Sequence, residues 1–226
     1  MPQPDVSVIL PCRNEEEGLG ECLTTIQSVF TAHNLHGEII VSDSSSDRSP
    51  EIARAHGARL IDHGASGYGI ALREGFQAAR SEFMICADAD MTYDFNDIPT
   101  FIARLKSGSD MVIGVRQYQP NVSPWLHEHV GVPATAFLIG LLFGGSVKDP
   151  HCGIRAITRS AYDQLALQTT GMEFASEMIV RALQKELKIA QLPTNYFARI
   201  GESKLNTFQD GWRHLRLLFQ LRTGLI

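Results

Sequence analysis

The N-terminal half of the chain alternates short apolar segments with amphipathic ones, and this alternation restricts the fold more than any other feature. Strands with apolar side chains on both faces are typical of the interior of a parallel sheet, and residues 6–10 (VSVIL) fit that pattern. The segments in between place apolar side chains at helical spacing, as Leu19, Leu23 and Ile26 do. We therefore expect an α/β fold with a Rossmann-like, mostly parallel sheet and helices on both faces. The predicted strands are 6–10, 38–42, 58–62 and 83–87, and the predicted helices are 15–30, 50–56 and 71–79.

Polar side chains come directly after three of these strands. Arg13 and Glu15 follow the first strand, Asp43 follows the second, and Asp88 and Asp90 follow the fourth. Ligands of open parallel sheets bind at the carboxyl ends of the strands. We therefore expect these residues to lie around one crevice.

The C-terminal half is less regular. Residues 130–147 form its longest uncharged stretch, but glycines and a proline interrupt it, and its helical part is shorter than the ~20 residues that span a bilayer. It is interpreted as a core or interfacial helix. Because the chain has no repeat, linker or break in composition, we expect a single domain over residues 1–226. Further predicted elements are helices at 97–105, 162–165, 173–187 and about 208–221, and strands at 111–115, ending at Arg116, and 190–193.

Composition excludes some classes of function. A net charge of −5 over 226 residues argues against nucleic-acid binding, which normally requires a basic face. The four cysteines have no CxxC spacing, and the first residues lack the pattern of a signal peptide. Both observations favour a cytoplasmic location.

The triplet Asp88-Ala89-Asp90 is the clearest chemical motif. Two carboxylates that flank one small residue at a strand end can face the same cation, and such oxygens suit Mg²⁺ or Mn²⁺. The alternative is a pair of capping residues for the following helix. Asp43, in a Ser-rich turn, either receives a nucleoside or only shapes the turn. Arg116, Arg199 and Lys204 either neutralise phosphate or lie on a solvated surface.

Seven motifs, in order and over nearly the whole chain, resemble the family 2 glycosyltransferases of the GT-A fold. Within that family the chain is most similar to the branch of dolichyl-phosphate mannosyltransferase and related polyprenyl-phosphate sugar synthases. The motifs are PCRNEE (11–16), VSD (41–43), GYG leading to REG (67–75), DAD (88–90), GVR (114–116), DPHCGIR (149–155) and GESK (201–204).

The resemblance implies roles for individual residues. Asp88 and Asp90 would bind the metal that carries the diphosphate of the sugar nucleotide, with Ala89 beside it, and Thr92 stands where relatives often place a third metal ligand. Ser42 and Ser44 depart from the family pattern of Asp and Gly, which leaves the base of the nucleotide open. The residues implied to hold the nucleoside are Pro11, Arg13, Glu15, Val41 and Asp43, and those implied to face the phosphates are Arg116, Arg199 and Lys204.

The implied reaction is a metal-dependent, inverting transfer of a hexose from a GDP- or UDP-hexose to a polyprenyl phosphate such as dolichyl or undecaprenyl phosphate. A phosphate acceptor is already anionic and needs only to be aligned. A soluble hydroxyl acceptor, the first alternative, would need a carboxylate base, for which Asp149 and Glu177 are the candidates. The alternative for Glu177 is an exposed acid paired with Arg181. The second alternative is a nucleotide-sugar-binding module without turnover.

The acceptor end is expected in the second half of the chain. His127, His129 and the apolar segment 130–143 could border an acceptor channel. The last predicted helix carries Arg213, Arg216 and Arg222 beside Trp212 and Phe219. Such a helix fits peripheral contact with a membrane surface, here the cytoplasmic face, although many amphipathic helices simply pack on a core.

Overall fold

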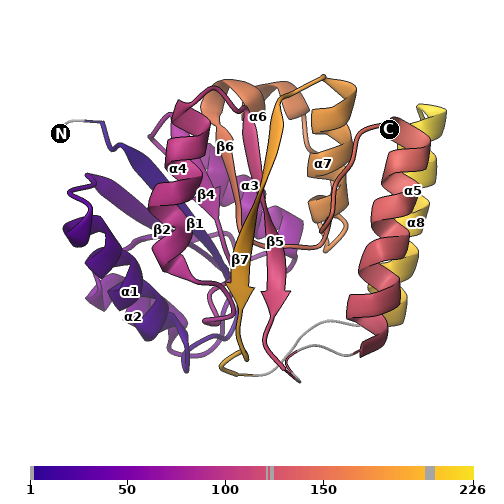
Figure 1. The fold of residues 1–226 in the computed structure, drawn as a ribbon. Helices are drawn as coiled ribbons and strands as arrows, with labels where there is room; N and C mark the ends of the chain where they lie inside the picture. The colour runs from indigo at the N-terminus through magenta and orange to yellow at the C-terminus, as the bar shows by residue number, and fades with distance from the viewer. Residues whose placement is uncertain (1–2, 121, 123–124, 202–206) are drawn as a thin grey trace.

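The computed structural model describes residues 3–120, 122, 125–201 and 207–226, the last segment with side chains from residue 211 onward. Its centre is a seven-stranded sheet in the order β3-β2-β1-β4-β6-β5-β7 (Figure 1). The strands are β1 (Val6–Cys12), β2 (Gly37–Asp43), β3 (Arg59–Asp62), β4 (Phe83–Cys86), β5 (Met111–Tyr118), β6 (Arg155–Thr158) and β7 (Ile189–Tyr196).

The sheet is mostly parallel, as predicted. β1 pairs in parallel with β2 and β4, β2 with β3, and β5 with β7. β6 runs antiparallel to both of its neighbours, β4 and β5. β6 was not predicted, because a segment of four residues that begins with Arg155 offers too short an apolar run to indicate a strand.

Helices cover both faces of the sheet, which confirms that prediction. The α4 helix lies in front of the sheet in Figure 1, and α3 lies behind it, against β1 and β2. α3 approaches β1 closely because residue 75 is glycine: a Cβ atom there would overlap Cγ2 of Ile9. The helices are α1 (Leu19–Ala32), α2 (Ser49–Ala55), α3 (Tyr68–Ala78), α4 (Ile98–Lys106) after the 3-10 turn η1 (Phe95–Asp97), α6 (Arg159–Leu165) and α7 (Phe174–Gln184).

Two further helices, α5 (Val132–Phe143) and α8 (Thr207–Thr223), pack together beside the sheet (Figure 1). A π-helical turn, η2 (His127–Gly131), precedes α5. α8 buries Leu217, Leu218 and Leu221 in the same hydrophobic cluster as the sheet. Among the described residues, we find no helix with the length and apolar content that crossing a membrane requires.

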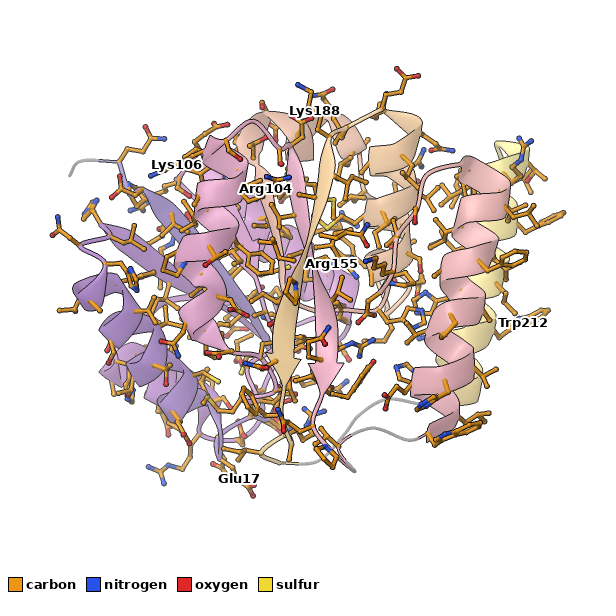
Figure 2. The ribbon with its side chains drawn as sticks, viewed as in Figure 1. Glu17, Arg104, Lys106, Arg155, Lys188 and Trp212 are labelled. Atoms are coloured by element: carbon orange, nitrogen blue, oxygen red, sulfur yellow. The ribbon has the colours of Figure 1, made fainter. Side chains whose placement is uncertain are left out.

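The outer sides of α5 and α8 expose large apolar side chains. Trp212 is 68% exposed and points away from the rest of the molecule (Figure 2). Among the described side chains of the two helices, the other large apolar residues that are exposed are Phe137, Leu141, Leu215 and Phe219. α8 is therefore amphipathic, as predicted, with its buried leucines on one side and these residues on the other.

β5 is longer than the sequence indicated. It pairs with β7 over eight residues and continues to Tyr118, so Arg116 lies inside the strand and does not end it. β7 also extends beyond the predicted 190–193 and contains Pro193. This proline is tolerated because β7 is the last strand of the sheet, where one row of backbone N–H groups needs no partner strand.

Candidate active site

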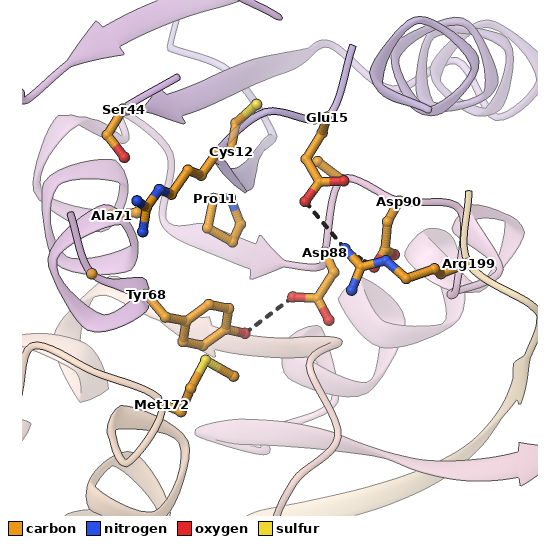
Figure 3. A pocket seen from close by; sticks show the side chains of 13 residues that line it. Pro11, Cys12, Glu15, Ser44, Tyr68, Ala71, Asp88, Asp90, Met172 and Arg199 are labelled. Carbon is orange, nitrogen blue, oxygen red and sulfur yellow. Dashed lines mark hydrogen bonds and ion pairs between the residues drawn. The ribbon is translucent and has the colours of Figure 1, made fainter. Parts of the chain in front are cut away.

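A cavity of about 220 Å³ lies at the carboxyl ends of β1, β2 and β4 (Figure 3). The strand order 3-2-1-4 reverses direction between β1 and β4, and such switch points are where open α/β sheets bind ligands. The predicted site residues in its wall are Pro11, Arg13, Glu15, Asp88, Ala89, Asp90 and Arg199. The other wall residues, which were not predicted as site residues, are Cys12, Ser44, Gly67, Tyr68, Ala71 and Met172.

Asp88 and Asp90 form an electrostatically strained pair in this wall. Burial and the negative charge of Asp90 raise the pKa of Asp88 to about 7. The Tyr68 hydroxyl donates a hydrogen bond to Oδ1 of Asp88 at 3.3 Å. Because a divalent cation would remove the repulsion between the carboxylates, and because Mg²⁺ and Mn²⁺ prefer such oxygens, the pair fits a metal ion.

The protein itself would supply only a few of the ligands of such a metal ion. Within the described ranges, no three or more His, Cys, Asp or Glu side chains converge in a way that could hold a metal ion. Asp88 and Asp90 would therefore leave most coordination positions to other oxygen atoms. This incomplete set suits a cation that binds together with a diphosphate, since Mg²⁺ is commonly held by one or two carboxylates plus substrate phosphates.

Thr92 orients the carboxylate of Asp90 through two hydrogen bonds. Its hydroxyl donates to Oδ1 of Asp90 at 2.5 Å, and its backbone N–H donates to the same atom at 3.1 Å. Met91, between them, has a φ of 62°, and this left-handed backbone folds the chain back so that both bonds can form. Thr92 is buried and does not belong to the cavity wall. The structure thus gives Thr92 the place of a positioning residue, which differs from the predicted third metal ligand.

Arg199 joins two acidic residues of the cavity. Its Nη2 atom lies 3.1 Å from Oε1 of Glu15 and 3.1 Å from Oδ2 of Asp90 (Figure 3). The three residues follow β7, β1 and β4, so one guanidinium links the ends of three strands. The positive charge predicted to face phosphate is thus present in the cavity. Lys204, predicted for the same role, lies outside the described residues.

Asp43 stabilises the loops on the β2 side of the cavity. This buried carboxylate accepts hydrogen bonds from the hydroxyl of Ser45 at 2.5 Å and from its backbone N–H at 3.1 Å. The Ser45 hydroxyl in turn accepts from the backbone N–H of Asn14 at 2.7 Å. Asp43 therefore fixes the loops after β1 and β2 to each other, and it does so without lining the cavity itself. Val41 is also buried away from the wall, within β2.

Arg13 lines the cavity and joins two of its loops. Its Nη1 atom donates to the Ser66 hydroxyl at 2.5 Å, which ties the loop after β1 to the loop before α3. The predicted nucleoside residues therefore divide into two groups. Pro11, Arg13 and Glu15 line the cavity. Val41 and Asp43 do not: Val41 lies within β2, and Asp43 holds the adjoining loop through Ser45.

Arg116, predicted to face the phosphates, and Asp149, a candidate base, bind each other. Arg116 donates from Nε to Oδ2 and from Nη2 to Oδ1 of Asp149, each at 2.7 Å, and both side chains are almost fully buried. The guanidinium also lies over the rings of Tyr118 and Tyr196, 5.1 and 5.3 Å from their centroids. Neither residue lines the cavity. In this arrangement Asp149 is a neutralised counter-ion, and its carboxylate is not placed as a free base.

Glu177, the other candidate base, holds a loop. Its carboxylate accepts hydrogen bonds from the backbone N–H groups of Gln168 and Thr169 and from the Thr169 hydroxyl, at 2.6 to 3.1 Å. The residue is fully buried, so the interpretation as an exposed acid was wrong, although the predicted ion pair with Arg181 is present at 3.8 Å. The loop it holds reaches the cavity at Met172. The geometry supports a structural role for Glu177.

The segment that carries Asp149 is clamped by a buried arginine. Arg155 donates to the carbonyl oxygens of Pro150, Cys152 and Ala175 at 2.6 to 2.8 Å, and it lies in the interior of the molecule (Figure 2). Gly153 packs beneath the metal-site carboxylate, where a Cβ atom would lie 2.6 Å from Oδ2 of Asp88. Arg155 and Gly153 belong to the motif at 149–155, but their residue types alone predict no role for either. Only their three-dimensional contacts reveal one.

Comparison with known proteins identifies the family. Residues 7–166, well over half of the chain, match the family described as "Glycosyl transferase family 2". The low-salt glycan biosynthesis hexosyltransferase of Haloferax volcanii is 40% identical over 99% of this chain. The chain belongs to glycosyl transferase family 2. It spans 55% of the length of that relative.

Other relatives, and a solved structure of similar fold, agree. The dolichyl-phosphate hexose transferase of Haloferax volcanii is 31% identical, with 92% of this chain and 89% of the relative aligned. The dolichol-phosphate mannosyltransferase of Pyrococcus furiosus is 27% identical, over 95% of this chain and 64% of its own length. The glucosyl-3-phosphoglycerate synthase of Mycobacterium tuberculosis, solved with Mn²⁺ and uridine diphosphate, superposes with a TM-score of 0.77 at 22% identity, over 98% of this chain and 80% of that one. The fold is GT-A, as the motifs implied.

Proposed function

We propose that this family 2 glycosyltransferase moves a hexose from a UDP- or GDP-hexose to a polyprenyl phosphate, with inversion at the anomeric carbon. The observation that carries the proposal is the Asp88–Asp90 pair in a switch-point cavity, with the guanidinium of Arg199 beside it. This arrangement offers a diphosphate both a cation site and a fixed positive charge.

Each residue of the site has its own role in the proposed reaction. Asp88 and Asp90 would hold Mg²⁺ or Mn²⁺, which as a Lewis acid stabilises the departing nucleotide diphosphate. Thr92 keeps Asp90 oriented, and Tyr68 does the same for Asp88. Arg199 would turn from Asp90 toward the diphosphate when the donor binds, which places its charge where negative charge develops.

A phosphate acceptor agrees better with the site than a hydroxyl acceptor does. Relatives are named for transfer to dolichyl phosphate, a nucleophile that needs no general base. The two carboxylates considered as bases are both engaged, Asp149 by Arg116 and Glu177 by the loop at Gln168. The hydroxyl acceptor and the module without turnover remain alternatives, to be distinguished by the acceptor panel below.

A lipid acceptor implies contact with a membrane surface, and α5 and α8 support such contact. Phe137, Trp212 and Phe219 are each more than 60% exposed, and Arg216 and Arg222 lie on the same helix as the two aromatic residues. Basic and aromatic side chains on one amphipathic helix suit the interface of an anionic membrane. We infer a cytoplasmic location at the inner face of the membrane.

The proposal is tested with a panel of nucleotide sugars, with and without Mn²⁺. Thermal shift is measured for the wild type, Asp90→Asn, and Asp163→Asn as a control, because Asp163 is an exposed carboxylate on α6 away from the cavity. We expect a metal-dependent increase in Tm with one donor, absent only from Asp90→Asn. Transfer is then assayed with a short-chain polyprenyl phosphate and with soluble hydroxyl acceptors. A metal-dependent nucleotide shift that persists in Asp90→Asn would sink the assignment of the metal site.

A further inference from the structure

Three histidines from three different elements form a row next to the Arg116–Asp149 pair. His127 comes from η2, His151 from the loop before β6, and His214 from α8. The rings of His127 and His151 are stacked with centroids 5.7 Å apart, and those of His151 and His214 are 4.8 Å apart. His214 is fixed at its other side, where Nδ1 lies 2.7 Å from the hydroxyl of Ser176.

The surroundings of this histidine row favour an anion. The positive charges of Arg116 and Arg155 both act on His151, and burial, His214 and these charges lower its pKa to about 2. Arg116 and Asp149 neutralise each other, whereas Arg155 donates to carbonyl oxygens and keeps its positive charge. The other acidic group that acts on His127 is Glu128, its neighbour in the chain. Neutral imidazole rings in a positive environment are available to donate N–H bonds to a negatively charged group.

His151 also has an unused polar atom. Its Nε2 atom is buried and has no hydrogen-bond partner among the described residues. A buried polar atom without a partner costs free energy, so its persistence calls for an explanation such as a ligand. The His151 ring is stacked with that of His127 and tilted by 40° to that of His214, and these two contacts restrict the orientation of the ring.

The row lies close to the cation site of the cavity. His151 is two residues from Asp149 and two from Gly153, and Gly153 packs directly beneath the carboxylate of Asp88. The charge of Arg116 also acts on Asp88. One short loop therefore carries both His151 of the row and Gly153, which packs against the metal-site carboxylate.

We propose that His127 and His151 bind the phosphate monoester group of the acceptor, and that His214 and Ser176 hold the row in place. This inference rests on the proposed function and assigns its acceptor subsite. The chemistry recognised is a phosphate monoester anion, which a polyprenyl phosphate and a small phosphorylated molecule both present.

The first test is a titration of the wild-type protein, in the presence of Mn²⁺ and nucleotide diphosphate. The ring resonances of its eight histidines are followed by NMR while inorganic phosphate, glycerol 3-phosphate or a short-chain polyprenyl phosphate is added. We expect the signals of His127 and His151 to move and that of His129 to stay, because His129 stacks on Trp125 outside the row. A response to all three probes identifies the phosphate as the recognised group, and a response to the polyprenyl phosphate alone assigns the site to the lipid. The inference is overturned if neither signal moves with any probe.

The second test uses variants that keep the ring stack. His151→Phe and His127→Phe preserve an aromatic ring but remove its nitrogen atoms, and His129→Phe is the matched control on the same turn. Loss of a hydrogen bond to a charged group predicts a rise of about ten- to hundredfold in the KM for the phosphorylated acceptor. The metal-dependent thermal shift with the donor should not change in any of the three variants.

The two tests separate this inference from the proposed function. If the donor shift is present but the acceptor KM of His151→Phe equals that of the wild type, the histidine row is not the acceptor subsite, although the transferase assignment stands. If no donor binds, the proposed function fails, and the phosphate titration of the wild type still decides whether the row binds an anion.

Discussion

Arg116 and Asp149 are joined by two hydrogen bonds of 2.7 Å, with side chains only 5% and 4% exposed. Removing one partner of such a buried pair leaves an uncompensated charge, so we expect Asp149→Ala to lower the free energy of unfolding by about 3–5 kcal/mol. Chemical denaturation measures this change. The control is Glu51→Ala, which breaks the exposed pair with Arg48 at 3.8 Å and should cost less than about 1 kcal/mol. Equal effects of the two substitutions would contradict the prediction.

Arg199 lowers the pKa of Asp88 through its positive charge. Arg199→Met should therefore raise that pKa further above about 7, which NMR of labelled aspartate carboxyls can follow. Because the charge beside the diphosphate is also lost, donor affinity should fall about tenfold or more. The control is Arg48→Met, at an exposed residue just before α2, which should change neither the pKa of Asp88 nor the donor affinity. A donor affinity unchanged in Arg199→Met would exclude a role for this residue in binding the diphosphate.

The raised pKa of Asp88 predicts two opposite pH dependences. In the folded, metal-free protein Asp88 keeps its proton up to about pH 7, whereas the unfolded chain releases it near its ordinary pKa of 3.8. The unfolded state therefore binds fewer protons in this window, and the contribution of Asp88 to the free energy of unfolding falls as pH rises through it. Asp88→Asn should remove that slope, which is measured by denaturation at several pH values. If the slope is the same in the variant, the raised pKa is refuted.

Metal binding should respond to pH in the other direction. A cation requires the ionised carboxylate, so Mn²⁺ affinity should increase as pH rises through about 7. Isothermal titration with Mn²⁺ and nucleotide diphosphate measures the affinity, and Asp163→Asn serves as the control that retains this dependence. An affinity that does not change between about pH 6 and about pH 8 would contradict the model of a shared cation at Asp88 and Asp90.

Glu177→Gln distinguishes a general base from a structural carboxylate. Three donors from Gln168 and Thr169 converge on Glu177, and hydrogen bonds to charged groups contribute about 1.5–3 kcal/mol. We expect a clear decrease in Tm, with kcat of the folded variant close to that of the wild type. A loss of about a hundredfold or more in kcat without a change in Tm would instead identify a base. Glu186→Gln, after the end of α7, is a control that should change neither value.

Membrane contact is checked with vesicles. Trp212→Ser combined with Phe219→Ser removes two exposed aromatic side chains from α8, and it should reduce flotation with anionic vesicles without lowering Tm. Phe197→Ser, an exposed aromatic outside α5 and α8, is the matched control and should float like the wild type. Equal flotation of the double variant and the wild type would exclude α8 as the contact surface.

Local patterns alone determined much of this protein. The apolar run 6–10 and its helical neighbours predicted the parallel sheet, because burial on both faces requires uninterrupted apolar side chains. The positions of Arg13, Asp88 and Asp90 after strands predicted a common crevice, and the cavity contains all three. These predictions succeeded because strand order and strand direction bring the carboxyl ends together whatever the details of the side chains.

Tertiary structure decided what each polar side chain touches. Arg116, Asp149 and Glu177 look alike in the sequence, as charged residues near motifs, yet the fold pairs the first two and buries the third beneath the loop at Gln168. The histidine row and the antiparallel strand β6 also depend on partners far apart in the chain, such as His151 and His214. A sequence fixes the residue types and their local periodicity, whereas the neutralisation of a charge or the stacking of a ring depends on which distant segment packs beside it.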